Sequence, residues 1–359
     1  MKNAIKSGAI LTVDLAALKQ NYRMLTDKVS SRELAAVVKA NAYGLGITEV
    51  SKALSRAGCS TFFVATLEEG IELREVLSDA TLYVFHGVLP GTAGDLIAHK
   101  LIPILNSFDQ IEEWRSQGNQ ATGLHVDTGM SRLGLTPDQY VIAQKLKDFR
   151  VDLVLSHLAC SEEKDHPKNA EQLNQFKRIQ NSTKAKQASL AASSGIFLGI
   201  DYQLDLCRAG ASLYGINPTP TSPNPMAQVI RLQAQILQIR SVDTPQTVGY
   251  GATHQATKPT KIATLAIGYA DGYMRSLGNL GKAFIDDYEV PVVGRISMDL
   301  TTVDISNVPD ALLTTGTLVD LIGPNNPIDK IAEQAGTIGY EILTSLSNRI
   351  ARRYISDVD

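Results

Sequence analysis

A lysine at the end of an apolar run is the residue best placed to do chemistry. Lys39 closes the run LAAVVK and is followed by ANAYGLG, which contains Tyr43 and two glycines. A lysine removed from water has a lowered pKa and can form Schiff bases with aldehydes. By position alone a solvated lysine is the better explanation, since long basic side chains readily extend into water. The tyrosine and the glycines shift the balance towards a loop that closes on a ligand.

Two later segments have the composition of a phosphate-binding site. They are SSG (193–195) and RAGA (208–211). Hydroxyl groups and free backbone N–H groups suit a phosphate monoester, although either segment alone is explained by an ordinary turn. Together with the strand-end lysine they indicate a phosphorylated aldehyde cofactor, pyridoxal phosphate.

Short apolar runs that alternate with helix-like segments must position these residues. The runs are 34–40, 61–66, 81–87, 101–106, 123–129, 151–157, 188–193 and 204–210. Thr48, Thr66 and Thr136 are candidate helix caps between them. Crossover-length connections predict parallel strands, and eight such units favour a closed (β/α)8 barrel. An open doubly wound sheet is less favoured, because no GxGxxG follows the first strand.

In such a barrel the active site lies at the carboxyl ends of the strands. The residues at those ends are Lys39, His86, Asn106, Asp127, Arg132, His157, Ser193, Ser194, Arg208 and Gly210. His86 is as consistent with a satisfied core histidine as with a cofactor contact. Asn106 is interpreted as a turn residue, and His166 and His254 as surface residues.

The pattern changes after the proline-rich connector 217–225. Short strand candidates separated by Gly, Pro and Asp turns follow it and predict a mostly antiparallel β domain. One late helix, IDKIAEQAG, should end at Gly336. The predicted domains are therefore a barrel domain over 1–226 and a β domain over 227–359. The barrel domain includes a further predicted strand over 9–13, ahead of the eight runs.

Composition excludes several classes of protein. The net charge of -3 gives no basic surface for nucleic acid or anionic membranes. Asp14 interrupts the N-terminal apolar run, and no stretch approaches the ~20 apolar residues of a spanning helix, so a cytoplasmic location is expected. Cys59, Cys160 and Cys207 are far apart, which favours buried, inert thiols over a metal site or disulfides.

Eight motifs in order resemble the alanine racemase family. They are AVVKANAYGLG (36–46), HVDTGMSRLG (125–134), SHLACSEE (156–163), RAGASLYGINP (208–218), VGYG (248–251), IGYADGYMR (267–275), VGRISMD (293–299) and TIGYEIL (337–343). The resemblance implies a homodimer that interconverts L- and D-alanine to supply D-alanine for peptidoglycan. Lys39 would carry the cofactor and handle the α-proton on one face, and Tyr250 from the partner subunit would do so on the other.

The resemblance also implies supporting roles. His157 would link Tyr250 to Arg208, and Arg208 would face the pyridine nitrogen. Because arginine only donates hydrogen bonds, that nitrogen would stay unprotonated, which should limit transamination. Arg132 and the backbone N–H of Met298 would bind the substrate carboxylate. The implied phosphate contacts are Tyr43, Ser194, Gly210, Ala211 and, from the second subunit, Tyr340; the implied entry corridor is Tyr269, Arg275, Arg295 and Ile338.

Three positions depart from the family pattern. The family often has a lysine, sometimes carbamylated, where this chain has His125, so another group must orient Arg132. His125 itself, a bound anion or Asp127 are the candidates. Ser193 replaces the usual asparagine before Ser194, which weakens any contact carried over to position 193. Ser297 replaces a common cysteine beside Met298, whose implied role is a backbone one.

Other functions remain open from the sequence. A racemase with broader specificity would share this architecture, and its periplasmic versions would carry a signal peptide. A non-catalytic pyridoxal-phosphate-binding barrel would lack the second domain. A barrel decarboxylase would place an acidic residue where this chain has Arg208.

Overall fold

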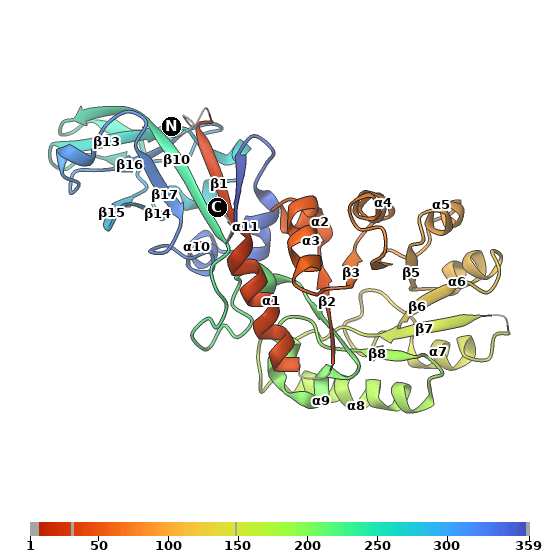
Figure 1. Ribbon diagram of the computed structural model, residues 1–359. Helices are drawn as coiled ribbons and strands as arrows, with labels where there is room; N and C mark the ends of the chain where they lie inside the picture. Colours follow the sequence, from red (N-terminus) through yellow and green to blue (C-terminus); the bar gives the residue numbers. More distant parts are fainter. Residues whose placement is uncertain (1–6, 30–31, 148, 357–359) are drawn as a thin grey trace. The chain divides into compact units, whose positions relative to one another are not determined.

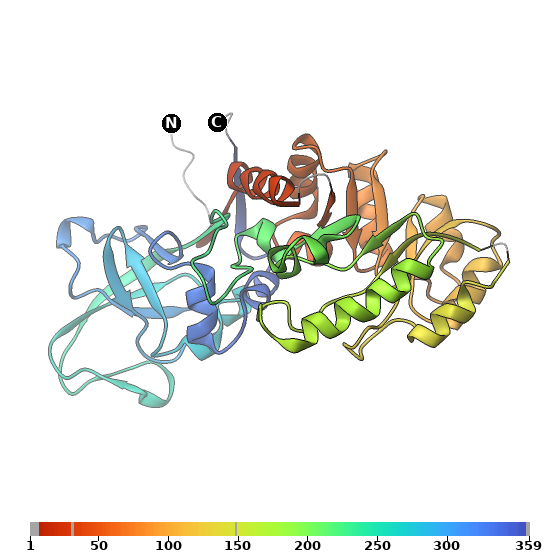
Figure 2. The ribbon, with the colours of Figure 1, turned by 90° about the horizontal axis from the view of Figure 1, so that it is seen from below.

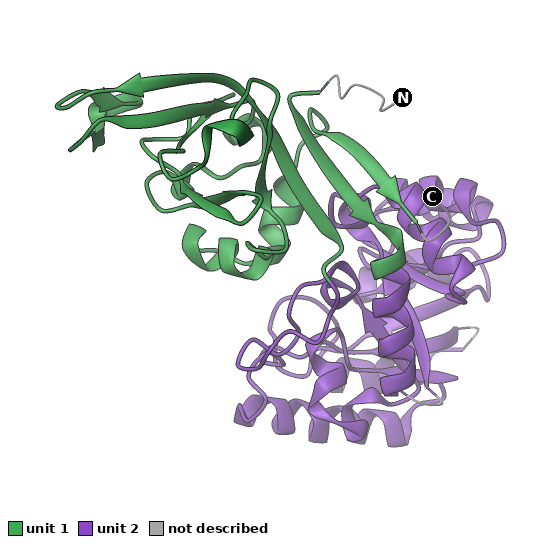
Figure 3. Ribbon diagram, turned by 60° about the vertical axis from the view of Figure 1, so that its left-hand side comes forward, with its two compact units in different colours: residues 1–17, 228–359 green, residues 18–227 purple. Residues whose placement is uncertain are grey.

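The computed structural model describes residues 7–29, 32–147 and 149–356, and the chain divides into two compact units (Figure 3). One unit comprises residues 18–227, and the other comprises residues 1–17 together with 228–359. This division corrects the predicted boundaries at the N-terminus. The strand over 9–13 was predicted to lie within the barrel domain, but it is part of the second unit.

Residues 18–227 form the predicted barrel (Figure 1). Eight parallel strands follow one another in the order β9-β2-β3-β4-β5-β6-β7-β8, and a parallel bridge between Ala192 and Arg208 nearly closes the ring. Every predicted run overlaps one of these strands: β2 (Glu33–Val37), β3 (Thr61–Val64), β4 (Thr81–Val84), β5 (Ile102–Leu105), β6 (Ala121–His125), β7 (Arg150–Leu155), β8 (Gln187–Ser189) and β9 (Leu206–Ala209).

Helices lie outside this ring of strands (Figure 2). They are α3 (Ile47–Arg56), α4 (Leu67–Val76), α5 (Ala93–Ala98), α6 (Phe108–Arg115), α7 (Pro137–Ala143), α8 (Pro167–Ser182) and the short α9 (Ile200–Gln203); α1 (Leu15–Val29) precedes β2. Thr66 and Thr136 cap α4 and α7 through capping boxes, as predicted. The prediction for Thr48 is wrong, because α3 already begins at Ile47, whose N–H donates to Asn41 Oδ1 at 2.7 Å.

The second unit is mostly antiparallel, as predicted. Its long strand β10 (Ile230–Val242) pairs with β1 (Ala9–Asp14), β13 (Thr260–Leu265) and β17 (Leu318–Ile322), all antiparallel. The exception is β18 (Ala351–Ile355), which lies parallel to β1. The remaining elements are β11 (Thr247–Val248), β12 (His254–Gln255), β14 (Lys282–Ile285), β15 (Tyr288–Pro291), β16 (Thr301–Asp304), α10 (Ile328–Ala335) and α11 (Gly339–Ser345). Helix α10 ends at Gly336, which has a left-handed φ of 71°, as expected.

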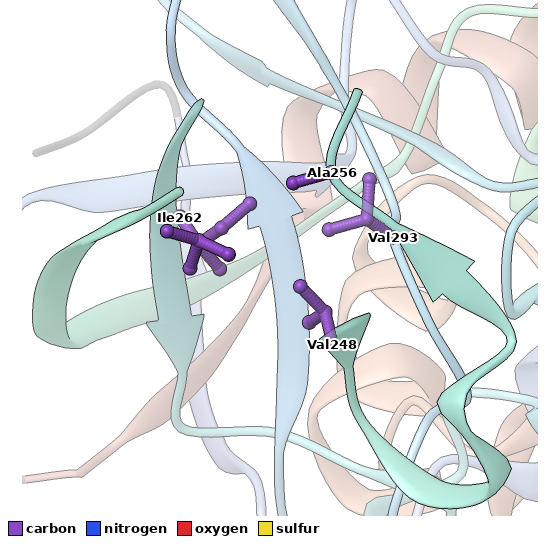
Figure 4. Close-up of a cluster of buried hydrophobic side chains, with 5 residues drawn as sticks. Val248, Ala256, Ile262 and Val293 are labelled. Atoms are coloured by element: carbon purple, nitrogen blue, oxygen red, sulfur yellow. The ribbon is translucent and has the colours of Figure 1, made fainter. Parts of the chain in front are cut away.

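A small apolar cluster in the second unit includes Val248, the first residue of the VGYG motif. Val248 and Ala256 meet Ile262 and Val293, and Val242 completes the cluster (Figure 4). Burying such side chains removes apolar surface from water and stabilises their common arrangement. The cluster therefore anchors the residue that lies two positions before Tyr250.

Two expectations from composition can be compared with the structure. Cys59 and Cys207 are buried, and burial raises the pKa of each thiol to about 12, which fits inert thiols. Cys160 is partly exposed, so the prediction of burial is wrong for that residue. Across the described ranges, no helix combines the length and apolar character needed to cross a membrane.

Candidate active site

Lys39 opens a turn that winds in the unusual direction. It begins α2 (Lys39–Tyr43), in which Ala40, Asn41, Ala42 and Tyr43 all have φ between 52° and 55°. L-amino acids are disfavoured in this left-handed conformation by about 1–2 kcal/mol per residue. Backbone bonds hold the turn, and the Ala40 N–H also donates to the carboxylate of Glu69 at 2.6 Å. Backbone strain of this kind is typical of functional sites.

The surroundings of Lys39 lower the pKa of its amine. Its side chain is open to solvent at the carboxyl end of β2, with the ammonium 5.8 Å from the centre of the Phe85 ring. Neighbouring protein displaces part of its water and lowers its pKa, the positive charge of Arg132 lowers it further, and Glu69 opposes both. An accessible lysine with a lowered pKa is suited to attack an aldehyde.

The predicted phosphate loops lie together beside Tyr43. A Cβ atom built on Gly210 would lie 2.5 Å from the Tyr43 hydroxyl, so only glycine fits there. Ser193 Oγ accepts hydrogen bonds from the Gly210 N–H at 2.9 Å and the Ser212 N–H at 3.2 Å. Ser194 is buried, and its hydroxyl makes no hydrogen bond within the described part of the chain. Ser193 therefore organises the loop, whereas the Ser194 hydroxyl has no partner within the described residues.

Arg208 is a buried cation on β9. Only 2% of it is exposed, and its guanidinium donates to Ser189 Oγ at 2.5 Å and to the Ser156 carbonyl at 2.7 Å. Burial lowers its pKa to about 10, which leaves the guanidinium protonated at neutral pH. It forms no ion pair with a carboxylate among the residues that the structure describes. A buried charge that has only neutral partners attracts an anionic or electron-rich ligand.

His157 lies next to Arg208 after the end of β7. Its Nδ1 is 3.5 Å from an Arg208 nitrogen, at the long limit of a hydrogen bond. Burial, and then the charges of Arg208 and Arg132, lower the pKa of His157 to about 3, so the ring is neutral at physiological pH. Because the guanidinium can only donate, Nδ1 accepts and Nε2 carries the proton.

His125 ends β6 and pairs with Asn106. Its Nδ1 is 3.0 Å from Asn106 Oδ1, and burial, followed by the charge of Arg208, lowers its pKa to about 4. Asn106 is 5% exposed and donates to the carbonyls of Phe85 and Ile104. Its interpretation as a turn residue is therefore wrong, because it connects three neighbouring strands. The sequence signal that could have identified it is its place at the end of β5.

Asp127 holds the loop that carries Arg132. Its carboxylate accepts the backbone N–H groups of Gly129, Met130 and Ser131, each at 2.8 Å. Arg132 itself is exposed, and within the described residues its guanidinium makes no hydrogen bond or ion pair. Asp127 is thus a structural residue, and Arg132 is available to a ligand.

The predicted site residues of the second unit are exposed. Tyr250 is 72% exposed, although Val248, two residues earlier, is buried. A Cβ atom on Gly251 would lie 3.0 Å from the Arg295 guanidinium, so Arg295 lies beside the tyrosine loop. The segment that contains Arg295 also contacts the loop YADG (269–272), where the Tyr269 N–H donates to the Ser297 carbonyl at 3.1 Å.

Further predicted residues belong to the same unit. Met298 is 53% and Ile338 57% exposed, which is unusual for apolar side chains of this size. Arg275 is exposed at the start of a short 3-10 helix, and Tyr340 is half-buried on α11. The predicted site therefore falls into two groups. The barrel holds Lys39, Tyr43, Arg132, His157, Ser194, Arg208, Gly210 and Ala211, and the second unit holds Tyr250, Tyr269, Arg275, Arg295, Met298, Ile338 and Tyr340.

Known proteins share both units. The chain is 47% identical to an alanine racemase of Rhodospirillum rubrum over 97% of this chain and 96% of that protein. It is 43% identical to a catabolic alanine racemase of Mesorhizobium japonicum over 97% of this chain and 94% of that protein. A crystal structure of alanine racemase from Bartonella henselae with covalently bound pyridoxal phosphate matches with a TM-score of 0.93 and 39% identity, over 97% of this chain and all of that chain (100%).

Family models match the two units in turn. The alanine racemase N-terminal domain matches residues 13–218, and the alanine racemase C-terminal domain matches residues 229–354. The chain therefore belongs to the alanine racemase family of pyridoxal-phosphate-dependent isomerases.

Proposed function

We propose that this protein interconverts L- and D-alanine with two acid/base groups, Lys39 and Tyr250, and that Tyr250 is supplied by the partner subunit of a homodimer. The proposal is supported by the pKa of Lys39 and the exposure of Tyr250. Lys39 has a lowered pKa at the mouth of the barrel, and Tyr250 is 72% exposed on a loop with an anchored base. An exposed tyrosine on such a loop is suited to enter a site on a second molecule.

The residues of the barrel fit pyridoxal phosphate. When bound, this cofactor withdraws electrons from the α-carbon of the substrate and makes its C–H bond more acidic. The Lys39 amine would hold the aldehyde carbon. The free Ser194 hydroxyl, the backbone N–H of Ala211, Tyr43, and Tyr340 of the partner subunit would hold the phosphate. The Gly210 N–H, which here donates to Ser193 Oγ, would exchange that partner for the phosphate. Arg208 would donate to the pyridine nitrogen, which gives its buried charge an electron-rich partner.

Inversion at one carbon requires a proton donor and a proton acceptor on opposite faces. The Lys39 amine would serve one face and the Tyr250 phenol the other. A tyrosine in water has a pKa near ~10, so the phenolate needs stabilisation to act near neutral pH. The His157 Nε2–H group would donate a hydrogen bond to the phenolate oxygen, while Arg208 fixes the ring through Nδ1.

The substrate carboxylate has two proposed partners. They are the exposed guanidinium of Arg132 and the backbone N–H of Met298 of the partner subunit. Tyr269, Arg275, Arg295 and Ile338 would line the route of entry. A passage lined by Tyr269, Tyr340 and Arg275 favours a small amino acid. We also propose that the product, formed in the cytoplasm, is used for peptidoglycan. Because one relative is a catabolic enzyme, growth of a D-alanine auxotroph on this gene is the test of that role.

A subunit-mixing experiment tests the two-base site. Lys39→Ala and Tyr250→Phe should each reduce alanine racemisation, measured by circular dichroism, by about a thousandfold or more. Tyr288→Phe is the matched control, because Tyr288 is an exposed tyrosine of the same unit outside the proposed site.

A mixed dimer of Lys39→Ala and Tyr250→Phe chains should regain activity, because one of its sites combines an intact lysine with the partner's intact tyrosine. If both groups came from one chain, every site in the mixed dimer would be defective and no activity would return. That result would reject the shared site.

A further inference from the structure

His125 is held at Nδ1 by an amide that has only one possible orientation. The Asn106 side-chain nitrogen donates to the Ile104 carbonyl at 2.7 Å and to the Phe85 carbonyl at 3.0 Å. Rotating the amide by half a turn would place its oxygen against two carbonyl oxygens. Asn106 Oδ1 must therefore face His125, and an amide oxygen can only accept.

It follows that His125 Nδ1 carries the proton. The ring is neutral near pH 7, because burial, the charges of Arg208 and Arg132, and the opposing charge of Asp127 leave its pKa at about 4. A neutral imidazole protonated at Nδ1 has a bare lone pair at Nε2. The far side of His125 is therefore a hydrogen-bond acceptor at the mouth of the barrel.

Gln110 reinforces this arrangement from outside the ring. Its side-chain oxygen accepts the Asn106 N–H at 2.8 Å, and its nitrogen donates to the His86 carbonyl at 2.8 Å. Asn106 is thus fixed through both its backbone and its side chain. Hydrogen bonds from a second layer of residues, as here from Gln110 through Asn106, hold a ligating or catalytic imidazole in one tautomer.

The loop that carries Arg132 is built around His125. The Leu135 N–H donates to the His125 carbonyl at 2.8 Å, and the Asp127 N–H donates to the Leu135 carbonyl at 2.8 Å. Gly134 has a φ of 110°, and a Cβ atom there would lie 3.1 Å from Cγ of the imidazole. Glycine thus allows the loop to pass against the ring two residues after Arg132.

Other charged groups near His125 already have hydrogen-bond partners. Arg208 donates to Ser189, Ser156 and Leu190, and the Asp127 carboxylate accepts three backbone N–H groups. Arg132 is the cation near His125 that has no hydrogen-bond acceptor within the described ranges.

We propose that His125 is a positioning residue, which accepts a hydrogen bond at Nε2 from Arg132 and so orients that guanidinium for the substrate carboxylate. A neutral acceptor differs from a carboxylate or a carbamate, because it fixes the direction of the arginine without neutralising its charge. The full charge then remains for the substrate. This inference rests on the proposed role of Arg132 in binding alanine.

Two substitutions at His125 distinguish the role of Nδ1 from that of Nε2. His125→Asn keeps an atom near the Nδ1 position but has no distal acceptor, whereas His125→Gln places an amide oxygen near Nε2. We expect His125→Asn to raise KM for alanine about tenfold with little change in kcat, and His125→Gln to restore most of the affinity. His99→Asn, at the end of α5, is the control and should change neither constant.

A spectroscopic readout does not depend on turnover. In the holoenzyme with ¹⁵N-labelled histidine rings, the resonances of His125 are those that disappear in His125→Gln. We expect the shift of a protonated nitrogen at Nδ1 and of an unprotonated one at Nε2. Arg132→Gln should move the Nε2 resonance and leave the Nδ1 resonance in place.

The outcomes distinguish this inference from the proposed function. Failure of the wild-type protein to racemise alanine would reject the function. If the wild type is active, two results would overturn the role of His125. One is an Nε2 resonance that does not move in Arg132→Gln, and the other is an equal KM in His125→Asn and His125→Gln. Protonation at Nε2 in place of Nδ1 would do the same, even if the variants failed to fold.

Discussion

The carboxyl ends of β6 and β7 hold two histidines that are both neutral near pH 7 and carry the proton on opposite ring nitrogens. His125 on β6 faces an amide oxygen, so it donates at Nδ1 and accepts at Nε2. His157, just after β7, faces a guanidinium, so it accepts at Nδ1 and donates at Nε2. The difference shows that the partner behind a histidine decides what the ring offers to a ligand. One ring is suited to orient a cation, and the other to stabilise an anion.

Replacing Arg208 should have the largest effect, because its charge acts on both histidines. We expect Arg208→Gln to reduce kcat about a hundredfold or more, since it removes the donor behind His157 and the proposed donor to the cofactor ring. Without this cation the pKa of both histidines should rise, and the acid limb of the kcat/KM profile should move to higher pH. Arg208→Lys keeps the charge and should leave the acid limb in place. Equal profiles for the two variants would contradict the electrostatic link.

Substitutions at His157 should invert the pattern expected at His125. His157→Asn removes the donor at the Nε2 position and should lower kcat about tenfold to a hundredfold with little change in KM. His157→Gln restores a donor there and should recover part of that loss. Steady-state kinetics in both directions give the measurement. A change in KM alone would mean that the two histidines have the same role.

Acid should destabilise the protein through both rings. Their native pKa values of about 4 and about 3 lie below the unfolded value of ~6.5, so the unfolded chain binds protons first as pH falls. The free energy of unfolding should therefore be insensitive to these groups above pH ~6.5. Below that pH it should fall by on the order of 1 kcal/mol per pH unit for each ring. Urea unfolding of wild type and His125→Gln at pH 5 and pH 8 measures this, and equal pH dependence would show that His125 does not contribute.

The smallest effect is expected at the glycine beside His125. Gly134→Ala adds a Cβ atom 3.1 Å from the imidazole at a φ of 110°, which should destabilise the fold by about 1–3 kcal/mol and displace Arg132. Thermal unfolding should show the loss of stability, and KM for alanine should rise. Gly118→Ala is the control, because it has a similar φ of 93° with no atom within 4 Å of the added Cβ. If both variants gave the same KM, the contact with His125 would be irrelevant.

Local patterns in the sequence predicted the barrel well. All eight apolar runs overlap strands, and the capping boxes at Thr66 and Thr136 form, because these features depend on neighbouring residues. Strand β1 belongs to the second unit because it pairs with β10 and β18, which lie more than 200 residues away. No local pattern in the sequence encodes this pairing.

The candidate site was predicted in part for the same reason. Lys39 and Arg208 were identified from strand ends and motifs, but the role of Asn106 depends on carbonyl groups of two strands that its amide meets only in the folded barrel. Ser193 was expected to be a weakened contact, whereas it organises the loop through Gly210 and Ser212. Side-chain hydrogen bonds across strands are thus what the linear pattern leaves out.

The turn after Lys39 has a stereochemical consequence of its own. Ala40 has an exposed side chain and backbone angles of φ 53° and ψ 50°, which are the mirror image of the ordinary right-handed helix. A D-amino acid adopts these angles without the penalty that an L-residue bears. In a chemically assembled chain, D-alanine at this position should tighten the backbone next to the lysine, whereas glycine should make it looser. The stretch that precedes Tyr43 would thus accommodate the mirror-image form of the very amino acid on which the protein is proposed to act.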